Sequence, residues 1–199
     1  CGTERGHISK DIITQDKIMY NQRNWRDILS EKPKDMTRVD YEVTLPKPDE
    51  DYMTTYRINR AKRNLRRFND VYRNSKTEVY DERHIDDPAT QMHHIFPANE
   101  YPQIADYLEN LIALTPTQHF TYAHPNNNTQ YIDRAYQYLC LIAKTGSIRD
   151  NLIGHKNEPV IYDFYLYQNV LNTGLETDEF FEVQEMDFDG LLNKIEKYY

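Results

Sequence analysis

Cysteine is nearly absent from this chain: two of its 199 residues are cysteines, Cys1 and Cys140. Two thiols cannot build a disulfide framework or a four-thiolate zinc site. The sequence also has no apolar run of the roughly 18 residues that a membrane-spanning helix needs, and its first ten residues, CGTERGHISK, contain no apolar run typical of a secretory signal. These absences predict a cytoplasmic protein with reduced thiols and no membrane partner. Cys140, between Leu139 and Leu141, is expected to be a small buried side chain.

The chain has no overall excess of positive charge either, and its net charge of −8 excludes a uniformly basic, sequence-blind nucleic-acid binder. The charge is unevenly distributed. Residues 158–199 carry ten acidic side chains against two lysines, whereas residues 1–157 carry 22 of each sign. Within the neutral part, segment 57–73 holds seven basic residues and one acidic residue. Such a segment is either a solvated helix face or a phosphate-binding one.

The order of the elements predicts an α+β fold that is mainly helical, with a two-strand element in the middle. Apolar residues at intervals of three and four predict an amphipathic helix over 52–74, with its arginines facing outward. Another helix is expected over 130–144, with Gly146 just past its end. Its inward-facing residues are expected to be Ile132, Ala135, Tyr136, Leu139 and Ala143. Further helices are expected within 8–31 and over 160–173 and 188–198, and a half-buried strand over 39–45. We divide the chain into an N-terminal helical and DNA-contacting region (1–80) with its basic helix at 57–73, a central module (81–128) and a C-terminal helical region with an acidic tail (129–199), all within one compact unit.

The window from Met92 to Pro125 is the most informative part of the sequence. It reads MHHIFPANEYPQIADYLENLIALTPTQHFTYAHP and holds four of the seven histidines. Its two apolar runs predict two strands, and Thr115-Pro116 is a helix start with threonine as N-cap and proline in the first turn. A hairpin that leads into a helix can bring His93, His94 and His119 to one small cleft.

These residue types suit the hydrolysis of a phosphodiester. Such a reaction uses a divalent metal to neutralise the phosphate and a base of near-neutral pKa to accept a proton from water. Imidazole can serve as metal ligand and as base. Adjacent strand residues point to opposite sides, so His93 and His94 are expected to divide these two roles.

The window resembles the HNH endonucleases with a ββα-metal module. The resemblance covers about 35 residues: His-His-Ile-Phe-Pro, then Glu-Asn-Leu-Ile-Ala-Leu-Thr-Pro, then His119. It implies that His93 and His119 are metal ligands and that His94 is the general base. It also implies that Asn110, at the start of the second strand, holds the loop and orients the base.

The window departs from that family in two ways. Family members often have a second helix histidine four residues after the first, but His124 follows His119 by five, which leaves open whether His124 is a metal ligand or a phosphate contact. Many members also bind a structural zinc through two cysteine pairs, which this chain lacks. The hairpin is therefore expected to be held by the packing of Phe96, Leu111, Ile112 and Leu114.

The function implied by the resemblance is a DNA endonuclease, specifically a type II restriction enzyme that cuts double-stranded DNA with one divalent metal ion. Mg²⁺ or Mn²⁺ is expected, and Zn²⁺ or Ni²⁺ also suits imidazole ligands. A homodimer and a partner methyltransferase are implied by the same resemblance. The alternatives are a nicking or phage-defence HNH nuclease that acts with partner proteins, and a DNA-binding module without catalysis. The expected DNA contacts are Arg57, Arg60, Arg63, Arg66, Arg67 and Arg83.

Overall fold

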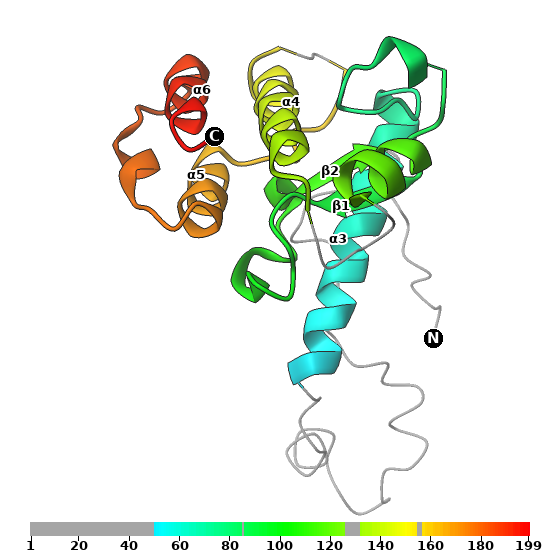
Figure 1. The fold of residues 1–199 in the computed structure, drawn as a ribbon, viewed down its shortest axis with the longest axis horizontal. Coiled ribbons are helices and arrows are strands. Elements are labelled where there is room, and N and C mark those ends of the chain that lie inside the picture. The colour runs from blue at the N-terminus through cyan, green and yellow to red at the C-terminus, as the bar shows by residue number, and fades with distance from the viewer. Residues whose placement is uncertain (1–49, 85, 126–131, 155–156) are drawn as a thin grey trace, which may run out of the picture. The chain divides into compact units, whose positions relative to one another are not determined.

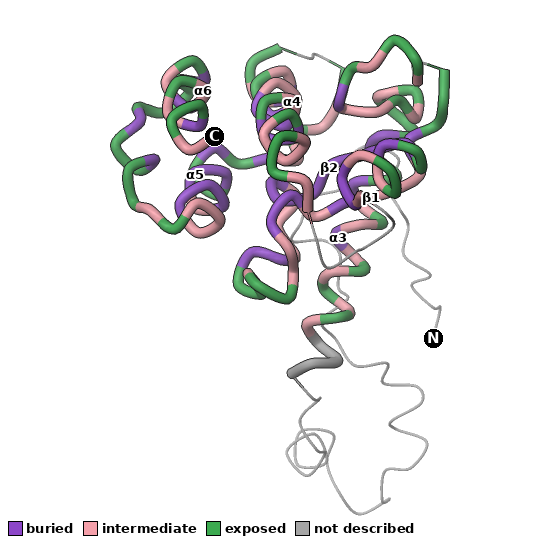
Figure 2. Tube along the Cα trace, in the orientation of Figure 1, coloured by how far each residue is buried: buried purple, intermediate pink, exposed green. Residues whose placement is uncertain are grey.

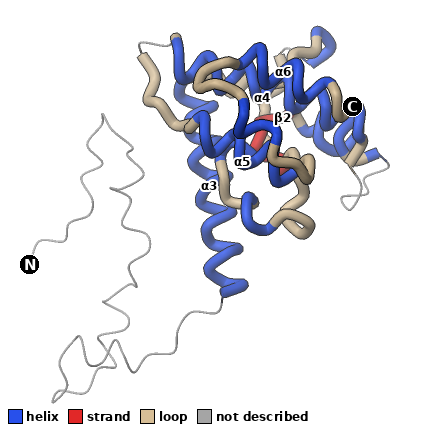
Figure 3. The backbone as a smooth tube through the Cα atoms, turned by 90° about the vertical axis from the view of Figure 1, so that its left-hand side faces the viewer, coloured by secondary structure: helices blue, strands red, loops and turns tan. Residues whose placement is uncertain are grey.

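The computed structural model describes residues 50–84, 86–125, 132–154 and 157–199. The chain divides into two units, 1–49 and 50–199, and all described residues belong to the second. The expected helices within 8–31 and the strand over 39–45 lie outside the described residues. Figures 1 and 3 show mostly helices around one short hairpin, which agrees with the predicted α+β class. No helix of the described part is both long and apolar enough to cross a membrane.

The basic segment forms helix α3, Glu50–Tyr72, as its periodicity predicts. Ala61, Leu65 and Phe68 are buried, because intervals of three and four residues place them on one side of the helix. This side packs against the hairpin and against the short helix η4, Leu108–Asn110. The predicted amphipathic helix is therefore confirmed.

The hairpin consists of two antiparallel strands, β1 (Gln91–His94) and β2 (Leu111–Leu114). In its register His93 is opposite Ile112, and His94 is opposite Leu111. Every residue of β2 is buried, so this strand runs through the middle of the core (Figure 2). The loop between the strands contains a second short helix, η3 (Pro102–Ile104), besides η4.

Helix α4, Arg134–Ile153, differs from its prediction in length and in orientation. Gly146 does not end this helix but lies within it. Ala135 and Leu139, expected to face inward, are exposed, and Leu139 retains 48% of its accessible surface. The buried face instead carries polar residues that have internal partners, among them Lys144 and Thr145. Tyr136 and Ala143, also expected to face inward, do pack against the core, so the prediction was wrong for Ala135 and Leu139 alone among these four.

The remaining elements complete the C-terminal half of the unit. Helices α5 (Phe164–Gly174) and α6 (Phe188–Glu196) agree with the expected helices, and the turn η7 (Glu179–Glu182) lies between them. Cys140 is fully buried, as predicted. The acidic region is therefore largely folded, and its first acidic residue, Glu158, accepts a 2.8 Å hydrogen bond from Arg73.

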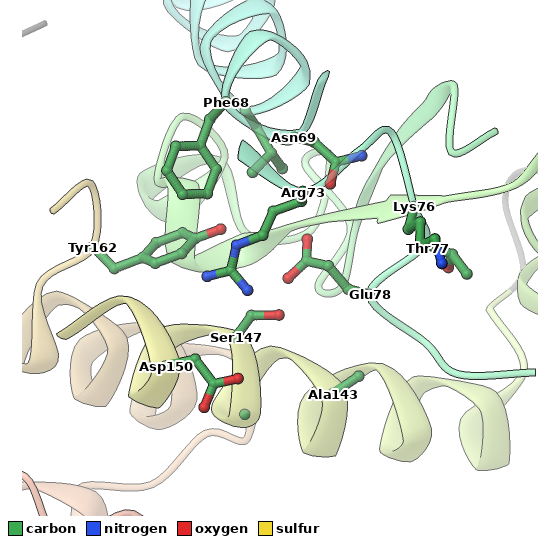
Figure 4. A pocket seen from close by; sticks show the side chains of 12 residues that line it. Phe68, Asn69, Arg73, Lys76, Thr77, Glu78, Ala143, Ser147, Asp150 and Tyr162 are labelled. Carbon is green, nitrogen blue, oxygen red and sulfur yellow. The ribbon is translucent and has the colours of Figure 1, made fainter. Parts of the chain in front are cut away.

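A cavity of about 340 Å³ lies between the end of α3 and α4 (Figure 4). Beside it Lys144, fully buried, donates hydrogen bonds to Glu78 (3.3 Å) and to the Tyr162 hydroxyl (2.8 Å). Glu78 in turn accepts a hydrogen bond from the Ala113 N–H of β2. Through Glu78, this network links α4 to strand β2 of the hairpin. Loss of Glu78 or Tyr162 would take a hydrogen-bond partner from the buried Lys144 ammonium, which is unfavourable.

Two glycines give a matched test of this packing. A Cβ atom at Gly174 would lie 2.3 Å from ring carbons of Phe96, whereas a Cβ atom at Gly146 would have no neighbour within 4 Å. We expect Gly174→Ala to lower the free energy of unfolding by about 1–3 kcal/mol through overpacking. Gly146→Ala, in the interior of α4, is expected to raise it by about 0.5–1 kcal/mol. Urea unfolding of both variants measures the difference, and a Gly174→Ala variant as stable as the wild type contradicts this close packing of α5.

Candidate metal centre

Three histidines from two elements meet at one point. His93 comes from β1, while His119 and His124 come from the helical segment that follows β2. One ring nitrogen of each lies within 4.8 Å of the other two. The ring centroids are 4.9–5.2 Å apart, with each pair of rings nearly perpendicular. His93 and His124 are buried and His119 is half-buried.

The helix that carries His119 begins as its sequence predicts. The Thr115 hydroxyl accepts a hydrogen bond from the Gln118 N–H (3.2 Å), and the Gln118 side chain accepts one from the Thr115 N–H (3.1 Å). This reciprocal pair is a capping box. Gln118 also donates to the Val79 carbonyl and accepts from the Thr77 hydroxyl. The start of the helix is thereby anchored to the chain that follows α3.

The five-residue spacing of the two helix histidines is accommodated by a π-helix, η5 (Gln118–Ala123). The His124 N–H donates to the His119 carbonyl at 3.1 Å, the five-residue hydrogen bond of this wider turn. One such turn therefore separates the two histidines, and both rings reach His93. The sequence leaves the role of His124 open, because an α-helical period does not bring positions five apart to the same side of the helix.

The electrostatics of the site favour the neutral form of His93 and of His119, the form that binds metal. Burial, followed by the neighbouring histidines, holds the pKa of His93 well below its usual value. Burial and then His124 lower the pKa of His119 to about 4. The Nδ1 atom of His119 is buried and has no hydrogen-bond partner among the described residues.

The donor set fits one divalent ion. In a tetrahedral site, two imidazole nitrogens at about 2.0–2.1 Å from the ion are about 3.4 Å apart. Separations of up to 4.8 Å therefore close to this value when each ring nitrogen moves by less than about 1 Å. Three histidines suit Zn²⁺, Mn²⁺ or Ni²⁺, whereas Mg²⁺ prefers oxygen ligands. The structure therefore supports a site that can hold a metal ion and leaves the identity of that ion unassigned.

His94 does not belong to the three-histidine cluster and makes a separate contact. Its Nε2 atom is 2.9 Å from the Ala105 carbonyl oxygen. A carbonyl only accepts hydrogen bonds, so Nε2 carries the proton and Nδ1 has the free lone pair. Burial, then the charge of Lys62, lowers the pKa of His94 to about 4, although its bond to Ala105 acts in the opposite direction. The ring is therefore neutral at pH 7, with one nitrogen able to accept a proton.

Asn110, completely buried, closes the loop between the two strands. Its side chain accepts a hydrogen bond from the Phe96 N–H (2.9 Å) and donates to the carbonyls of Phe96 (3.0 Å) and Ile104 (3.3 Å). Ile104 directly precedes Ala105, which holds His94. Asn110 thus fixes the backbone that sets the orientation of the His94 ring, and it ends η4 directly before β2.

The predicted DNA-contacting arginines differ in their exposure and in their partners within the protein. Arg57 lies 3.6 Å from Asp106, Arg66 donates to the Thr90 carbonyl, and Arg83 makes a two-bond contact with Asp81. Arg63 and Arg67 are exposed and have no ion-pair partner within the described residues, and Arg60 is half-buried. Arg57, Arg66 and Arg83 have partners in three different segments of the chain, and Arg63 and Arg67 are the side chains most available to an external phosphate.

The lowered pKa of His94 predicts a pH dependence of stability. An unfolded histidine titrates near 6.5, whereas His94 in the fold titrates near 4. The unfolded chain therefore binds more protons between these values, and this contribution to stability, present above pH 6.5, is lost as the pH falls toward 4. Burial raises the pKa of Glu109 to about 7, which acts in the opposite direction. The test is therefore a comparison with His94→Asn.

In metal-free protein, the unfolding free energy of wild type is expected to decline more steeply than that of His94→Asn between pH 6.5 and 4.5, by about 1 kcal/mol per pH unit. Urea titrations at several pH values in the presence of a chelator measure both slopes. Parallel curves would show that His94 titrates like a free histidine.

Comparisons with models of known protein families, with curated proteins and with solved structures found no match to this chain.

Proposed function

We propose that this protein is a metal-dependent DNA endonuclease of the HNH type, and specifically a type II restriction enzyme. The observation that carries the proposal is that two adjacent strand residues, His93 and His94, lie in different environments. His93 joins His119 and His124 in a cluster that can bind a metal ion. His94 stands apart from them, neutral, with its proton on Nε2.

In this proposal His94 is the general base. Its Nδ1 atom accepts a proton from the attacking water, while the Ala105 carbonyl stabilises the imidazolium that results by accepting the Nε2–H hydrogen bond. Asn110 is a positioning residue, since it holds the Ile104–Ala105 backbone through its side-chain amide. A metal ion bound by the histidines would neutralise charge on the phosphate and on the departing oxygen.

The number of ligands favours a catalytic site over a structural one. Structural zinc sites are closed by four protein ligands, commonly cysteines, whereas catalytic sites keep a position for water or substrate. The cluster contains three ligands, and among the described residues no cysteine, aspartate or glutamate joins them. The DNA-binding module without catalysis is for this reason the weaker alternative.

Plasmid cleavage separates the remaining alternatives. The purified chain is incubated with supercoiled plasmid and Mg²⁺, Mn²⁺, Zn²⁺ or Ni²⁺ in turn, with a chelated sample as control. A set of discrete linear fragments is the result expected of a restriction enzyme. Nicked circles alone indicate a nicking enzyme, a smear indicates a sequence-blind nuclease, and DNA binding without cleavage contradicts the endonuclease proposal.

The exposed arginines predict how the protein holds DNA. If Arg63 and Arg67 each neutralise one phosphate, the double change to Gln should reduce the slope of log affinity against log salt by about 1.8, which is 0.9 for each contact. The cleavage positions should stay the same, because phosphate contacts carry no sequence information. Replacing Arg57 and Arg66 with Gln is the matched control, since both have partners within the protein. An unchanged slope in the folded Arg63/Arg67 variant contradicts a role for this face in DNA binding.

A further inference from the structure

The cavity between the end of α3 and α4 has an apolar wall and a polar wall (Figure 4). The apolar wall includes the rings of Phe68 and Tyr162, which meet edge to face with their centroids 6.4 Å apart. The volume of about 340 Å³ falls in the range of about 300–1,000 Å³ that is typical of small-molecule sites. Neither His94 nor any histidine of the candidate metal cluster lines this cavity, so it is separate from the site described above.

The polar wall carries two buried N–H donors without a hydrogen-bond partner in the described part of the chain, Asn69 Nδ2 and Arg73 Nε. Asn69 is 2% exposed. The Arg73 backbone N–H donates to the Asn69 carbonyl at 2.9 Å, so the last helical turn places both side chains on the same side. Another nitrogen of the guanidinium donates to Glu158 at 2.8 Å and holds the group in place. In the view of Figure 4 the guanidinium lies between Tyr162 and Ser147. A buried donor without a partner destabilises the fold, and an acceptor supplied by a ligand removes that penalty.

The carboxylates that line the cavity have other partners. Glu78 already accepts two hydrogen bonds, and Asp150 lies 3.5 Å from Arg149. Lys76, an exposed lining residue, has no ion-pair partner among the residues that the structure describes. The polar capacity left unused is therefore that of donors and of a positive charge, which an anionic oxygen complements.

Gly146 of α4 leaves room for a ligand. It lines the cavity, and a Cβ atom there would have no neighbour within 4 Å. A ligand with an apolar body can bury that body in the cavity against the rings of Phe68 and Tyr162. A carboxylate has two acceptor oxygens, one for each unpaired donor, and its hydrogen bond to a guanidinium is charge-assisted.

We propose that this cavity is a binding site for a small organic carboxylate, whose two oxygens accept hydrogen bonds from Asn69 Nδ2 and Arg73 Nε and whose apolar body contacts Phe68 and Tyr162. The inference goes beyond the proposed nuclease function and does not depend on it, because the cavity shares no residue with the candidate metal centre. A bound carboxylate would link α3 to α4, since the two donors belong to the end of α3 and Gly146 belongs to α4.

Calorimetric titration of the full chain with sodium benzoate tests this site, in metal-free protein from which the chelator has been removed by dialysis. Benzamide has the same ring and nearly the same shape but no charge, and sodium acetate has the charge but no ring. Benzoate is expected to bind with a dissociation constant below about 1 mM, and at least about 10-fold more tightly than either of the others. The reason is that benzoate alone supplies both the charge-assisted hydrogen bonds and the apolar body.

Two variants with matched controls locate the binding. Gly146→Leu should abolish benzoate binding, because the new side chain occupies the open space, whereas the smaller change Gly146→Ala should retain most of it. Asn69→Ala should weaken benzoate binding by about 10-fold or more, the effect of losing one hydrogen bond to a charged group. Asn64→Ala, also on α3 but outside the cavity, should bind benzoate as the wild type does.

Folded wild-type protein that binds no benzoate, or that binds benzoate and benzamide equally, overturns the inference and leaves a cavity filled by water alone. Unchanged benzoate affinity in a folded Gly146→Leu or Asn69→Ala protein overturns it as well, because the anion then binds elsewhere. If either variant does not fold by circular dichroism, Gly146→Met or Asn69→Ser is measured in its place with the same criteria. None of these outcomes affects the proposed nuclease function, which plasmid cleavage tests separately.

Discussion

Replacement of His94 with alanine is expected to reduce DNA cleavage by about 10²- to 10⁴-fold, the usual contribution of a general base. Metal affinity and DNA affinity should stay close to those of wild type, because the lost group acts in the transition state rather than in binding. The reason is geometric: His94 bonds to Ala105 and does not belong to the three-histidine cluster. Single-turnover cleavage at saturating enzyme measures the effect on the chemical step.

A second histidine supplies the control for this experiment. His84 lies outside the cluster and pairs with Asp87 at 2.8 Å. His84→Ala should therefore keep the wild-type cleavage rate. A His94→Ala enzyme that retains more than about a tenth of the wild-type rate would show that another group accepts the proton.

The second large effect is expected on metal binding. His119→Ala and His124→Ala each remove one of three protein ligands and should weaken Zn²⁺ or Co²⁺ binding by at least about 100-fold, more than the 10- to 100-fold typical of changes outside the ligand shell. Cleavage should be lost in both variants. Isothermal titration of the metal-free proteins gives the affinities, with His84→Ala again as the control.

The His124 variant is the more informative of the two, because only the π-helix brings this residue to the cluster. If the five-residue turn is retained in solution, His124→Ala should lose metal affinity to the same extent as His119→Ala. A His124→Ala variant that binds metal normally but binds DNA weakly would instead make this residue a phosphate contact. Either result decides between the two roles that the sequence leaves open.

The sequence by itself determined those features that depend on neighbours in the chain. The apolar stripe of α3, the bounds of β2 and the start of the helix at Thr115 follow from periodicity and capping, which involve residues within a few positions of one another. The buried position of His93 and the different environment of His94 follow from the alternation of a strand. For the same reason the sequence predicts different candidate roles for these two adjacent histidines.

Other features depend on partners that are distant in the chain, and only the tertiary structure decided them. The inward face of α4 carries Lys144, which is stable in the core because Glu78 and Tyr162 satisfy it, and neither is near it in the sequence. In the sequence, Arg57 and Arg66 cannot be distinguished from the other arginines of their helix. The structure shows that they have internal partners, Asp106 and the Thr90 carbonyl.

His124 shows the same limit at the site itself. Its ring reaches His93 through a five-residue turn that its own sequence does not predict. Local patterns record the preferences of the backbone and of one face of an element. Whether a charged or polar side chain is paired, buried or aimed at a ligand depends on three-dimensional neighbours, because the cost of burying it is set by the partners that it finds there.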